Sequence, residues 1–472
     1  MIESVEKFVD VSIPHDGVQP ESKPDPKPKQ ETADFELPPQ ESRLKSFWRH
    51  HTMSQYRRLV YLITAINIGY LIYGLTNGGW WAAGNINLAT LSNMVIANIG
   101  VAILIRQQYV INLLFKIATS VPTNWPLSIR WTMGKVYHFG GIHMGGAVAG
   151  TVWFVLFAGS IVFQFVNNVP GISVATFVVT AVLIAILIAM IVMATPTLRA
   201  KYHDNFELMH RFGGWASLIF FWVQTVLFIN DQRGALSFSE AFFASPGFWV
   251  LTLVTISIAL PWLHLKKVDV DIVSPSNHVA LVRFNHGVTP FAGSSTAVSR
   301  NPLIEWHSFA NVPSPNEDGF RLTISRAGDW TGKFIDDKPK KVWVKGIPTA
   351  GVGNVDKLFK RVVWIATGSG IGPTLPHLLT GETPARLIWS TRDARKTYGD
   401  DLVDEILNHE PNALIWNTDE RGRPDLVKLA YQAVQEFDAE AVIVISNQKL
   451  TRMVVYGMES RGIPAYGAIW DS

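Results

Sequence analysis

The chain has 472 residues, of which 48% are hydrophobic and 17% are charged, and its formal net charge is +3. The length predicts more than one domain, and so small a net charge gives no support to a nucleic-acid partner. The sequence contains no cysteine, which excludes disulfides, thiol catalysis and cysteine-ligated iron–sulfur clusters.

The N-terminal stretch is polar, acidic and rich in proline, as in Pro20–Pro28. Such a composition buries too little apolar surface to offset the entropy lost when the chain orders. We therefore expect a disordered cytosolic tail over residues 1–45, and we find no pattern of a cleavable signal peptide in it.

Six apolar segments follow, each close to the roughly 20 residues that a helix needs to cross a bilayer. They predict a membrane α-helical bundle of six spans over residues 46–266. The spans lie near 58–76, 88–106, 140–166, 171–196, 208–230 and 246–264. Basic residues are concentrated in alternate loops. The opposite loops carry almost none, and Arg233 is the one between the fifth and sixth spans. The positive-inside rule therefore places both termini and the C-terminal half in the cytosol, in a membrane that the sequence does not identify.

Histidines stand at the cytosolic starts of the third and fifth spans. They are His138, His143, His203 and His210. Imidazoles from two facing helices can be the axial ligands of one inner haem, for which we prefer His143 and His210. The alternative is interfacial histidines that form hydrogen bonds or touch a cofactor or lipid headgroup. An outer haem would need histidines further along the same helices, where residues such as Gln224 cannot ligate iron, so we expect no electron transfer across the membrane.

Gly-Gly pairs follow histidines on both of these spans, at Gly140-Gly141 and Gly213-Gly214. Small residues let helices approach closely, so we expect the third and fifth spans to pack together there. Space for a planar ligand is the alternative.

The second half of the chain changes to short β-rich runs and then to alternating strands and helices. The first set predicts an antiparallel β-barrel over residues 267–357, with runs at 268–272, 278–283, 320–324 and 341–344. The second set predicts a parallel α/β domain over residues 358–472, with strands at 362–366, 385–389, 413–416 and 441–445. A barrel followed by such a domain is the layout of ferredoxin-reductase-like flavoproteins.

The strand at 362–366 runs directly into Gly368–Pro373 (Gly-Ser-Gly-Ile-Gly-Pro), and a helical pattern follows. Glycine lets the backbone approach an anion, and the first N–H groups of a helix point toward it. The stretch predicts a phosphate-binding turn, and a tight strand–helix turn without a ligand is the alternative.

Motifs in the barrel region resemble flavin-binding segments of ferric reductases and NADPH oxidases. Trp306–Phe309 (Trp-His-Ser-Phe) resembles their His-Pro-Phe-Thr motif, and Gly328–Thr331 resembles their Gly-Asp-Trp-Thr segment. Lys345–Gly351 stands where those proteins have the glycine turn under the flavin pyrophosphate.

Further motifs resemble the NADPH site of the same proteins. Gly368–Pro373 matches their nicotinamide-nucleotide loop. Trp389–Asp393 resembles the segment whose arginine, here Arg392, binds the 2′-phosphate of NADPH. Gly422–Pro424 (Gly-Arg-Pro) is similar to another stretch of that site. The resemblance extends from about residue 55 to the end of the chain.

The resemblance implies two cofactors, FAD and NADPH, and no catalytic side chain that we can name. The residues that it assigns to FAD are Trp306, His307, Ser308, Phe309, Arg326, Trp330, Thr331, Gly346 and Trp470. The residues that it assigns to NADPH are Gly368, Ser369, Gly370, Gly372, Pro373, Ser390, Thr391, Arg392, Arg423 and Ser446. Tyr466 could stack on the flavin in place of Trp470, and a core position would explain either aromatic residue. For Arg326 the alternative is a surface ion pair with Asp329.

Two positions depart from the family pattern. Ala310 stands where the flavin motif has threonine, and Ser308 or Asn311 could supply the lost hydroxyl or polar group. Ile445-Ser446 stands where the family has a Cys-Gly pair beside the nicotinamide. With the missing outer histidines, this combination is most similar to the fungal Tmp-type integral membrane flavoproteins. It also resembles the membrane reductase part fused to some adenylate-forming enzymes.

We therefore expect a membrane-bound, FAD-dependent oxidoreductase that takes a hydride from cytosolic NADPH and passes it to a cytosolic or membrane-soluble small molecule. Two alternatives stay open: a one-haem enzyme like the ferric reductases and NADPH oxidases, and a non-catalytic, nucleotide-binding signalling protein. A transporter is disfavoured, because the spans lack an inverted repeat and paired charges. The expected partners are the unidentified acceptor and the lipid membrane.

Overall fold

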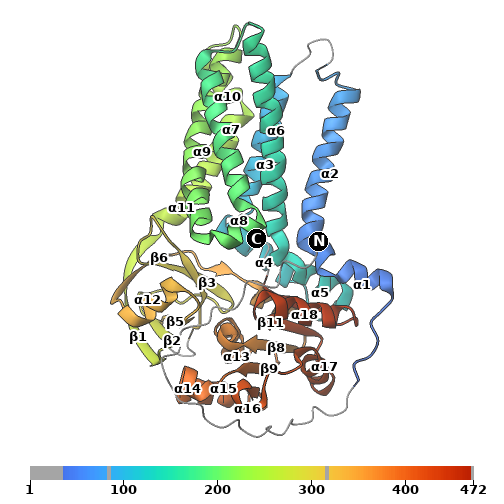
Figure 1. Ribbon diagram of the computed structural model, residues 1–472, viewed down its shortest axis with the longest axis vertical. Helices are drawn as coiled ribbons and strands as arrows, with labels where there is room; N and C mark the ends of the chain where they lie inside the picture. Colours follow the sequence, from blue (N-terminus) through green and yellow to red (C-terminus); the bar gives the residue numbers. More distant parts are fainter. Residues whose placement is uncertain (1–35, 82–86, 314–317, 469–472) are drawn as a thin grey trace, which may run out of the picture.

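A computed structural model of the protein describes residues 36–81, 87–313 and 318–468. A bundle of long helices forms one end of the molecule, and an antiparallel β domain and an α/β domain lie side by side at the other end (Figure 1). Most of the predicted tail and the proposed flavin-stacking Trp470 lie outside the described residues.

Each of the six predicted spans coincides with a helix. The helices are α2 (Gln55–Thr76), α3 (Leu88–Leu104), α6 (Gly140–Val166), α7 (Val174–Ala194), α9 (His203–Gln232) and α11 (Pro246–Leu263). In the described part of the chain, five helical stretches are long and apolar enough to cross a membrane. The pair of α3 and α4 (Gln108–Thr119), bent by 71°, would make a sixth span.

The long helix α6 packs against α2 and α3 through its glycines. A Cβ atom on Gly145 would lie 2.9 Å from the side chain of Ile63 in α2, and one on Gly146 would lie 2.9 Å from the carbonyl oxygen of Asn98 in α3. On α9, Gly213 faces Met190 of α7, and a Cβ on Gly214 would meet no atom within 4 Å. The prediction that the Gly-Gly pairs join the third and fifth spans is therefore wrong, because Gly141 of the first pair faces the Tyr56 carbonyl of α2 and Gly213 of the second pair faces α7.

Shorter helices lie around the bundle. They are α1 (Arg43–Arg49), η1 (His51–Met53), α5 (Leu127–Met133), η3 (Gly134–Phe139), α8 (Pro196–Lys201) and α10 (Phe238–Ala244). Helices α4 and α5 lie where the bundle meets the α/β domain (Figure 1). Ile111 and Phe115 of α4 are buried in the same apolar core as Val362 and Trp364 of the α/β domain.

The β domain is an antiparallel sheet with the strand order β4-β3-β6-β1-β2-β5, and β7 pairs with β3. Its elements are β1 (Leu265–Ser276), β2 (Val279–Phe284), β3 (Ser294–Ser299), β4 (His307–Ala310), β5 (Phe320–Ser325), α12 (Asp329–Asp337), β6 (Lys341–Lys345) and β7 (Thr349–Ala350). An isolated bridge between Val312, just after β4, and Arg321 in β5 nearly closes the sheet. The predicted antiparallel barrel is confirmed.

The α/β domain has a five-stranded parallel sheet with the order β10-β9-β8-β11-β12. Its strands are β8 (Val362–Thr367), β9 (Ala385–Thr391), β10 (Leu414–Asn417), β11 (Ala441–Ile445) and β12 (Ala465–Gly467). The remaining elements are η4 (Val352–Leu358), η5 (Gly368–Gly370), α13 (Ile371–Thr380), α14 (Ala394–Tyr398), α15 (Asp400–His409), α16 (Thr418–Arg421), α17 (Leu426–Phe437) and α18 (Gln448–Glu459). The strand order reverses between β8 and β11, which is where open α/β sheets bind their ligands.

Buried polar contacts join the α/β domain to the bundle. Arg130 of α5 bonds both carboxylate oxygens of Glu440, at 2.6 and 3.0 Å, and donates to the carbonyl of Leu358 at 3.0 Å. The hydroxyl of Tyr466 donates to the carbonyl of Trp131 at 3.0 Å, and the Tyr466 ring is fully buried. Tyr466 is therefore an aromatic residue of the domain junction, which rules out its suggested role in stacking on the flavin.

The end of the predicted tail also belongs to this junction. The backbone N–H of Glu41 donates to the carbonyl of Ser460 at 2.7 Å, and Arg461 donates to the carbonyl of Pro38 at 2.8 Å. Residues from 36 onward are thus ordered against α18, contrary to the prediction of disorder up to residue 45.

Candidate active site

The glycine turn follows β8 directly and is held by the neighbouring strands. Gly368 has a φ of +49°, which favours glycine, and its carbonyl accepts a hydrogen bond from the buried Trp389 indole at 3.0 Å. A Cβ on Gly370 would clash with the carbonyl oxygen of Ile445, at the end of β11. The turn therefore lies at the switch point of the sheet, with the N-terminus of α13 immediately after it.

Hydroxyl groups from two strands meet beside this turn. Thr367 Oγ1 and Ser446 Oγ lie 2.6 Å apart, at the carboxyl ends of β8 and β11. The next residue, Asn447, caps α18 by accepting from the backbone N–H of Leu450 at 3.0 Å. The predicted nucleotide residue Ser446 is thus adjacent to the glycine turn.

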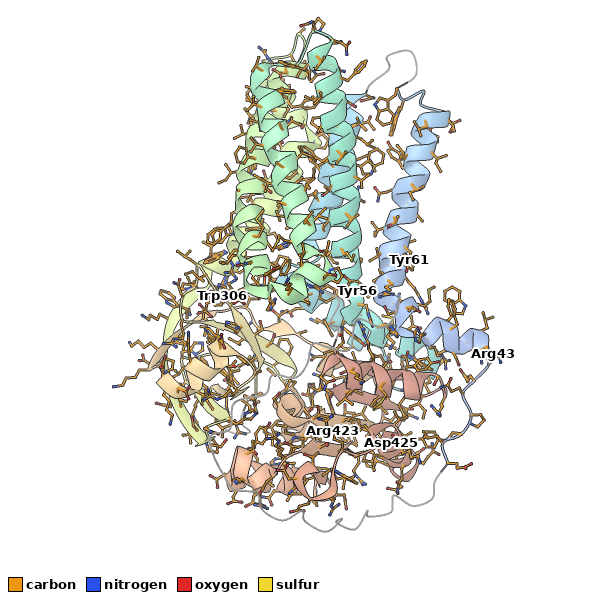
Figure 2. The ribbon with its side chains drawn as sticks, viewed as in Figure 1. Arg43, Tyr56, Tyr61, Trp306, Arg423 and Asp425 are labelled. Carbon is orange, nitrogen blue, oxygen red and sulfur yellow. The ribbon has the colours of Figure 1, made fainter. Side chains whose placement is uncertain are left out.

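Two predicted arginines lie at the same edge of the sheet, after the next two strands, β9 and β10. Arg392 comes directly after β9, and Arg423 comes after β10 and the short α16. Both are exposed, and neither has a hydrogen bond or ion pair among the described residues. Figure 2 shows Arg423 in the α/β domain, beside Asp425, the N-cap of α17. Free guanidinium groups in this position can form paired hydrogen bonds to a phosphate.

The charge of Arg392 also affects a histidine of the β domain. Burial lowers the pKa of His278, in the turn between β1 and β2, and the charges of Arg326 and Arg392 lower it further. Arg392, at the carboxyl edge of the sheet, is therefore close enough to the β domain for its charge to act on His278.

Ser390 and Thr391, at the end of β9, are both buried. The Tyr398 ring packs against Trp389 with ring centroids 5.0 Å apart. Burial raises the pKa of Tyr398 to about 12, although hydrogen bonds with Ser325 and Thr391 act in the opposite direction. Thr391 is thus already bonded inside the protein.

The two predicted flavin motifs meet in an aromatic stack. The His307 ring of β4 lies 4.0 Å from the Trp330 ring of α12, at 27°, and Trp330 stacks in turn on Phe334 at 5.0 Å. Phe309 stacks on the same indole at 6.1 Å. The Trp330 N–H is buried without a partner among the described residues. Glu305 Oε2 lies 2.8 Å from His307 Nε2, which would be an ion pair with a protonated imidazole.

The other predicted flavin residues have partners within the protein. Arg326 bonds Asp336 at 2.5 and 3.1 Å and the carbonyl of Asn277 at 2.9 Å, so its ion pair is with Asp336 instead of Asp329. The Thr331 hydroxyl accepts from the backbone N–H groups of Ala327 and Gly328, at 2.9 and 3.0 Å.

The suggested replacements for the lost threonine differ in accessibility. Asn311 is fully buried and donates to Ser294 Oγ at 2.9 Å, so its side chain forms a hydrogen bond inside the barrel. Ser308 is exposed on β4 and is the better placed of the two.

Trp306 and Gly346 lie where the β domain meets the bundle, and Figure 2 shows Trp306 at this boundary. The backbone N–H of Gly346 donates to the carbonyl of His264 at 3.1 Å. Lys345 Nζ lies 4.2 Å from the centre of the Trp306 ring and 5.0 Å from that of Trp262 in α11. Burial, together with a smaller effect of the Arg211 charge, lowers the pKa of Lys345 to about 8.

Of the four predicted histidines, the structure brings two together. The His143 and His210 rings lie 6.3 Å apart between α6 and α9, and His143 Nδ1 is 2.7 Å from the carbonyl oxygen of Ala102. His138 is buried in η3 beside Tyr137, and the exposed His203 lies 3.6 Å from Glu207. Among the described residues, no group of three or more His, Cys, Asp or Glu side chains could hold a metal ion.

A buried His–Asp pair escaped the sequence analysis. His377 Nδ1 of α13 lies 2.6 Å from Asp356 Oδ2 of η4, and both side chains are less than 5% exposed. A Cβ on Gly293 of the β domain would lie 2.8 Å from the imidazole, so the pair is located where the two domains meet. No local sequence pattern joins these residues, because the contact depends on the relative position of α13 and η4.

Comparison with known proteins identifies reductases as relatives. A family model described as the C-terminal domain of adenylate-forming reductase 03009 matches residues 352–472. Adenylate-forming reductase 03009 from Coprinopsis cinerea is 44% identical over 434 residues, which cover 92% of this chain and 42% of the relative. Adenylate-forming reductase 06235 from the same organism is 43% identical over 425 residues, which cover 90% of this chain and 41% of the relative. The chain is homologous to part of these reductases.

The chain therefore spans less than half the length of these relatives. The predicted resemblance to the part fused to adenylate-forming enzymes is confirmed, whereas the closer resemblance to Tmp-type proteins and ferric reductases stays a prediction. Among solved structures, a ferredoxin NADP+ reductase from Neisseria gonorrhoeae, with bound FAD and NADP, covers 43% of this chain and 98% of its own. It is 13% identical, with a TM-score of 0.35.

Proposed function

We propose that this chain is a membrane-bound, FAD-dependent oxidoreductase that oxidises NADPH and passes the hydride to a small molecule. The names of its homologues support a reductase. The observation that carries the proposal is the carboxyl edge of the parallel sheet. There the glycine turn, the Thr367–Ser446 hydroxyl pair and the unpaired Arg392 all lie around the point where the strand order reverses.

Each part of this edge matches a part of NADPH. The N-terminus of α13 suits the pyrophosphate, because a helix N-terminus attracts anions. Arg392 and Arg423 suit the 2′-phosphate, which NADH lacks. The small side chain of Ser446 lets a flat ring approach the end of β11. Thr367 and Ser446 together offer hydroxyl groups to that ring.

The residues of the flavin motifs fit an aromatic, anionic cofactor. Trp330 offers a buried N–H that has no partner among the described residues, and its ring belongs to a stack with His307 and Phe334. The ion pair of Arg326 with Asp336 is exposed and therefore weak enough for a phosphate to displace. FAD, when bound, supplies the hydride-accepting chemistry. The protein's part is to orient the two ring systems and to exclude water.

We place the reaction on the cytosolic side of a membrane, with no electron transfer to the other side. The length and hydropathy of the bundle helices support a membrane. The position fourteen residues after His210 is Gln224, which cannot ligate the iron of an outer haem. The acceptor is therefore cytosolic, or reaches the flavin from the inner leaflet near Trp306 and Lys345.

Steady-state oxidation of NADPH by the full chain in detergent, with added FAD and ferricyanide as acceptor, tests this proposal. We expect NADPH consumption that depends on FAD and is much slower with NADH. Tight binding of FAD and NADPH without consumption under any acceptor would favour the non-catalytic, signalling alternative.

A one-haem enzyme is the second candidate. The spacing of 6.3 Å between the centroids of the His143 and His210 rings favours it, because imidazoles from two neighbouring helices would then be close enough to hold one haem iron. His143 Nδ1 lies 2.7 Å from the Ala102 carbonyl oxygen, and a proton donated there would leave the lone pair of Nε2 for a metal, as in histidines whose other ring nitrogen donates to a carbonyl. A Soret band that is lost in His210→Ala would support this candidate.

A further inference from the structure

A cavity of about 270 Å³ lies within the bundle, between α3, α6, α9 and α11. Its inner walls include the rings of Phe154, Phe157, Phe221 and Phe228, whose neighbouring centroids are 5.3 to 5.8 Å apart. Residues that follow α9 and α10 form its outer end, far from the nucleotide-binding domains (Figure 1). Fourteen residues of α9 separate His210 from Gln224, or about 21 Å at 1.5 Å per residue.

The side chain of Gln224 in this wall has one hydrogen-bonding atom to which no described residue bonds. Gln224 is 5% exposed, and its Oε1 accepts from Thr180 Oγ1 at 3.1 Å. Its Nε2 is buried and has no hydrogen-bond partner in the part of the chain that the structure describes. Buried amide N–H groups are normally bonded, so this donor is suited to an oxygen atom from a ligand.

Water is poorly suited to the part of the cavity that lies between the phenyl rings. A buried water needs two to four polar partners, and phenyl rings offer none. Phe221, Gln224, Thr225, Phe228 and Gln232 recur at helical spacing on the cavity-facing side of α9. Gln232 Nε2 already donates to the carbonyl of Gly171 at 2.6 Å, so Gln224 supplies the amide N–H that is left for an apolar molecule with one acceptor oxygen.

The rim of the cavity adds a positive charge. Arg233 lines the outer end, is exposed, and donates to the carbonyl of Leu236 at 2.9 Å. No carboxylate pairs with it among residues 36–81, 87–313 and 318–468. Nine residues separate Gln224 from Arg233, which is about 13 Å along the helix.

We infer that this cavity binds an amphiphilic organic anion. The apolar body lies between the phenyl rings, a carbonyl oxygen accepts from Gln224 Nε2, and a carboxylate faces Arg233. The site lies too far along α9 from the nucleotide-binding domains for the ligand to be reduced there. It is a binding site in addition to the proposed reductase site, and it does not depend on NADPH or FAD.

Photolabelling with 4-benzoylbenzoate tests this inference, because that probe joins an aryl ketone to a carboxylate. The full chain in lipid nanodiscs is irradiated with increasing probe, and the labelled peptides are mapped by mass spectrometry. We expect saturable labelling of cavity residues from α3 and α9. In Gln224→Leu the probe concentration for half-maximal labelling should rise about tenfold, as expected for one lost hydrogen bond.

Matched variants distinguish binding of the probe in the cavity from its nonspecific binding to the bundle. Gln164→Leu removes an amide from α6 outside the cavity and should leave labelling unchanged. Arg233→Gln should weaken labelling by 4-benzoylbenzoate but not by neutral benzophenone. Ala89→Phe, at an exposed rim position, should block both probes even if Gln224→Leu folds poorly. Equal effects of Gln224→Leu and Gln164→Leu, or labels outside the cavity, would overturn the inference.

Discussion

Unpaired positive charge distinguishes the carboxyl edge of the parallel sheet from its surroundings. Arg395 bonds Asp400 at 2.8 Å and Asp404 at 2.7 Å, and Arg321 bonds Glu405 at 2.6 Å. Arg392 and Arg423 have no such partners in the described part of the chain. A phosphate can therefore bind to Arg392 and Arg423 without breaking an existing ion pair.

Arg392→Ala should raise the KM for NADPH about 10- to 100-fold and leave the KM for NADH nearly unchanged. A hydrogen bond to a charged group contributes about 1.5 to 3 kcal/mol, and only NADPH carries the 2′-phosphate. Arg395→Ala is the matched control, since that arginine already has two carboxylate partners. Equal losses with both nucleotides would contradict the assignment of Arg392.

Gly370→Ala should destabilise the protein strongly, because the added Cβ would clash with the Ile445 carbonyl. Gly372→Ala is the control in the same turn, where a Cβ would lie 3.5 Å from Thr323 in ordinary contact. Thermal unfolding of both variants checks this, with an expected cost of about 1 to 3 kcal/mol for the first alone. Similar melting temperatures would show that the turn has room.

Lys345→Met should stabilise the protein at pH 7, and the gain should shrink as the pH rises past about 8. The folded pKa of about 8 lies below the ordinary 10.5, so the unfolded chain holds the proton over that interval. The free energy of unfolding of the native protein therefore rises with pH between about 8 and 10.5. Below pH 8 the lysine is charged in both states, and the buried charge destabilises the folded state by its full amount. Melting temperatures at pH 7 and 9.5 measure this.

Lys341→Met is the control for Lys345, because Lys341 is an exposed residue of the same strand, 3.3 Å from Asp269. Its effect on stability should be small at both pH values. A gain from Lys345→Met that does not change with pH would mean that the lysine is not buried as a charge.

Sequence motifs located the site residues better than they described their partners. The glycine turn, Arg392, His307 and Trp330 could be selected because local spacing or family resemblance marks them. The partners of Arg326 and Tyr466 could not be predicted, since Asp336 and Trp131 are brought close to them only by the tertiary fold.

At the scale of elements, helices α4 and α5 fix the reductase domains to the bundle. The core cluster of the α/β domain includes Ile111 and Phe115, and Arg130 is 4% exposed. Hydropathy does not predict this arrangement, because a short amphipathic helix reads as an ordinary surface helix. The Ser-Ser-Thr strand β3 and the three-residue β12 were missed for a similar reason, since neither forms an apolar run of useful length.

Arg130→Met should cost about 2 to 3 kcal/mol of unfolding free energy. Losing one partner of a fully buried ion pair costs about 3 to 5 kcal/mol, and Glu440 retains 21% exposure. Burial alone would raise the pKa of Glu440, but bonds from Arg130 and the Lys360 backbone lower it overall. The pair therefore stabilises the fold above the ordinary pKa of 4.5, and its contribution is lost as the pH falls through the lower folded value.

Limited proteolysis and thermal unfolding measure the effect of Arg130→Met. We expect faster cleavage in the connections from α4 to α5 and from η4 to β8, which meet at this junction. Arg361→Met is the control, because its ion pair with Asp438 is exposed and should contribute less than about 1 kcal/mol. Equal effects of the two substitutions would mean that the junction does not depend on the buried pair.

At the scale of the whole molecule, three parts are joined in one arrangement: an apolar bundle, an antiparallel barrel and a parallel α/β domain. Their order along the chain could be predicted, because apolar length, alternation and glycine turns are local signals. The packing of α6 against α2 and α3 could not, since the sequence does not say which helix each glycine faces. The cavity around Gln224 was hidden for the same reason.

An absorption spectrum of the detergent-purified full chain, before and after anaerobic addition of NADPH, tests the central proposal most directly. The account predicts flavin bands that bleach when NADPH is added, without a Soret band. A Soret band that sharpens on reduction would favour the one-haem enzyme, with His143 and His210 as ligands. Flavin bands that stay unbleached by NADPH, or no chromophore even after FAD is added, would contradict the proposed oxidoreductase.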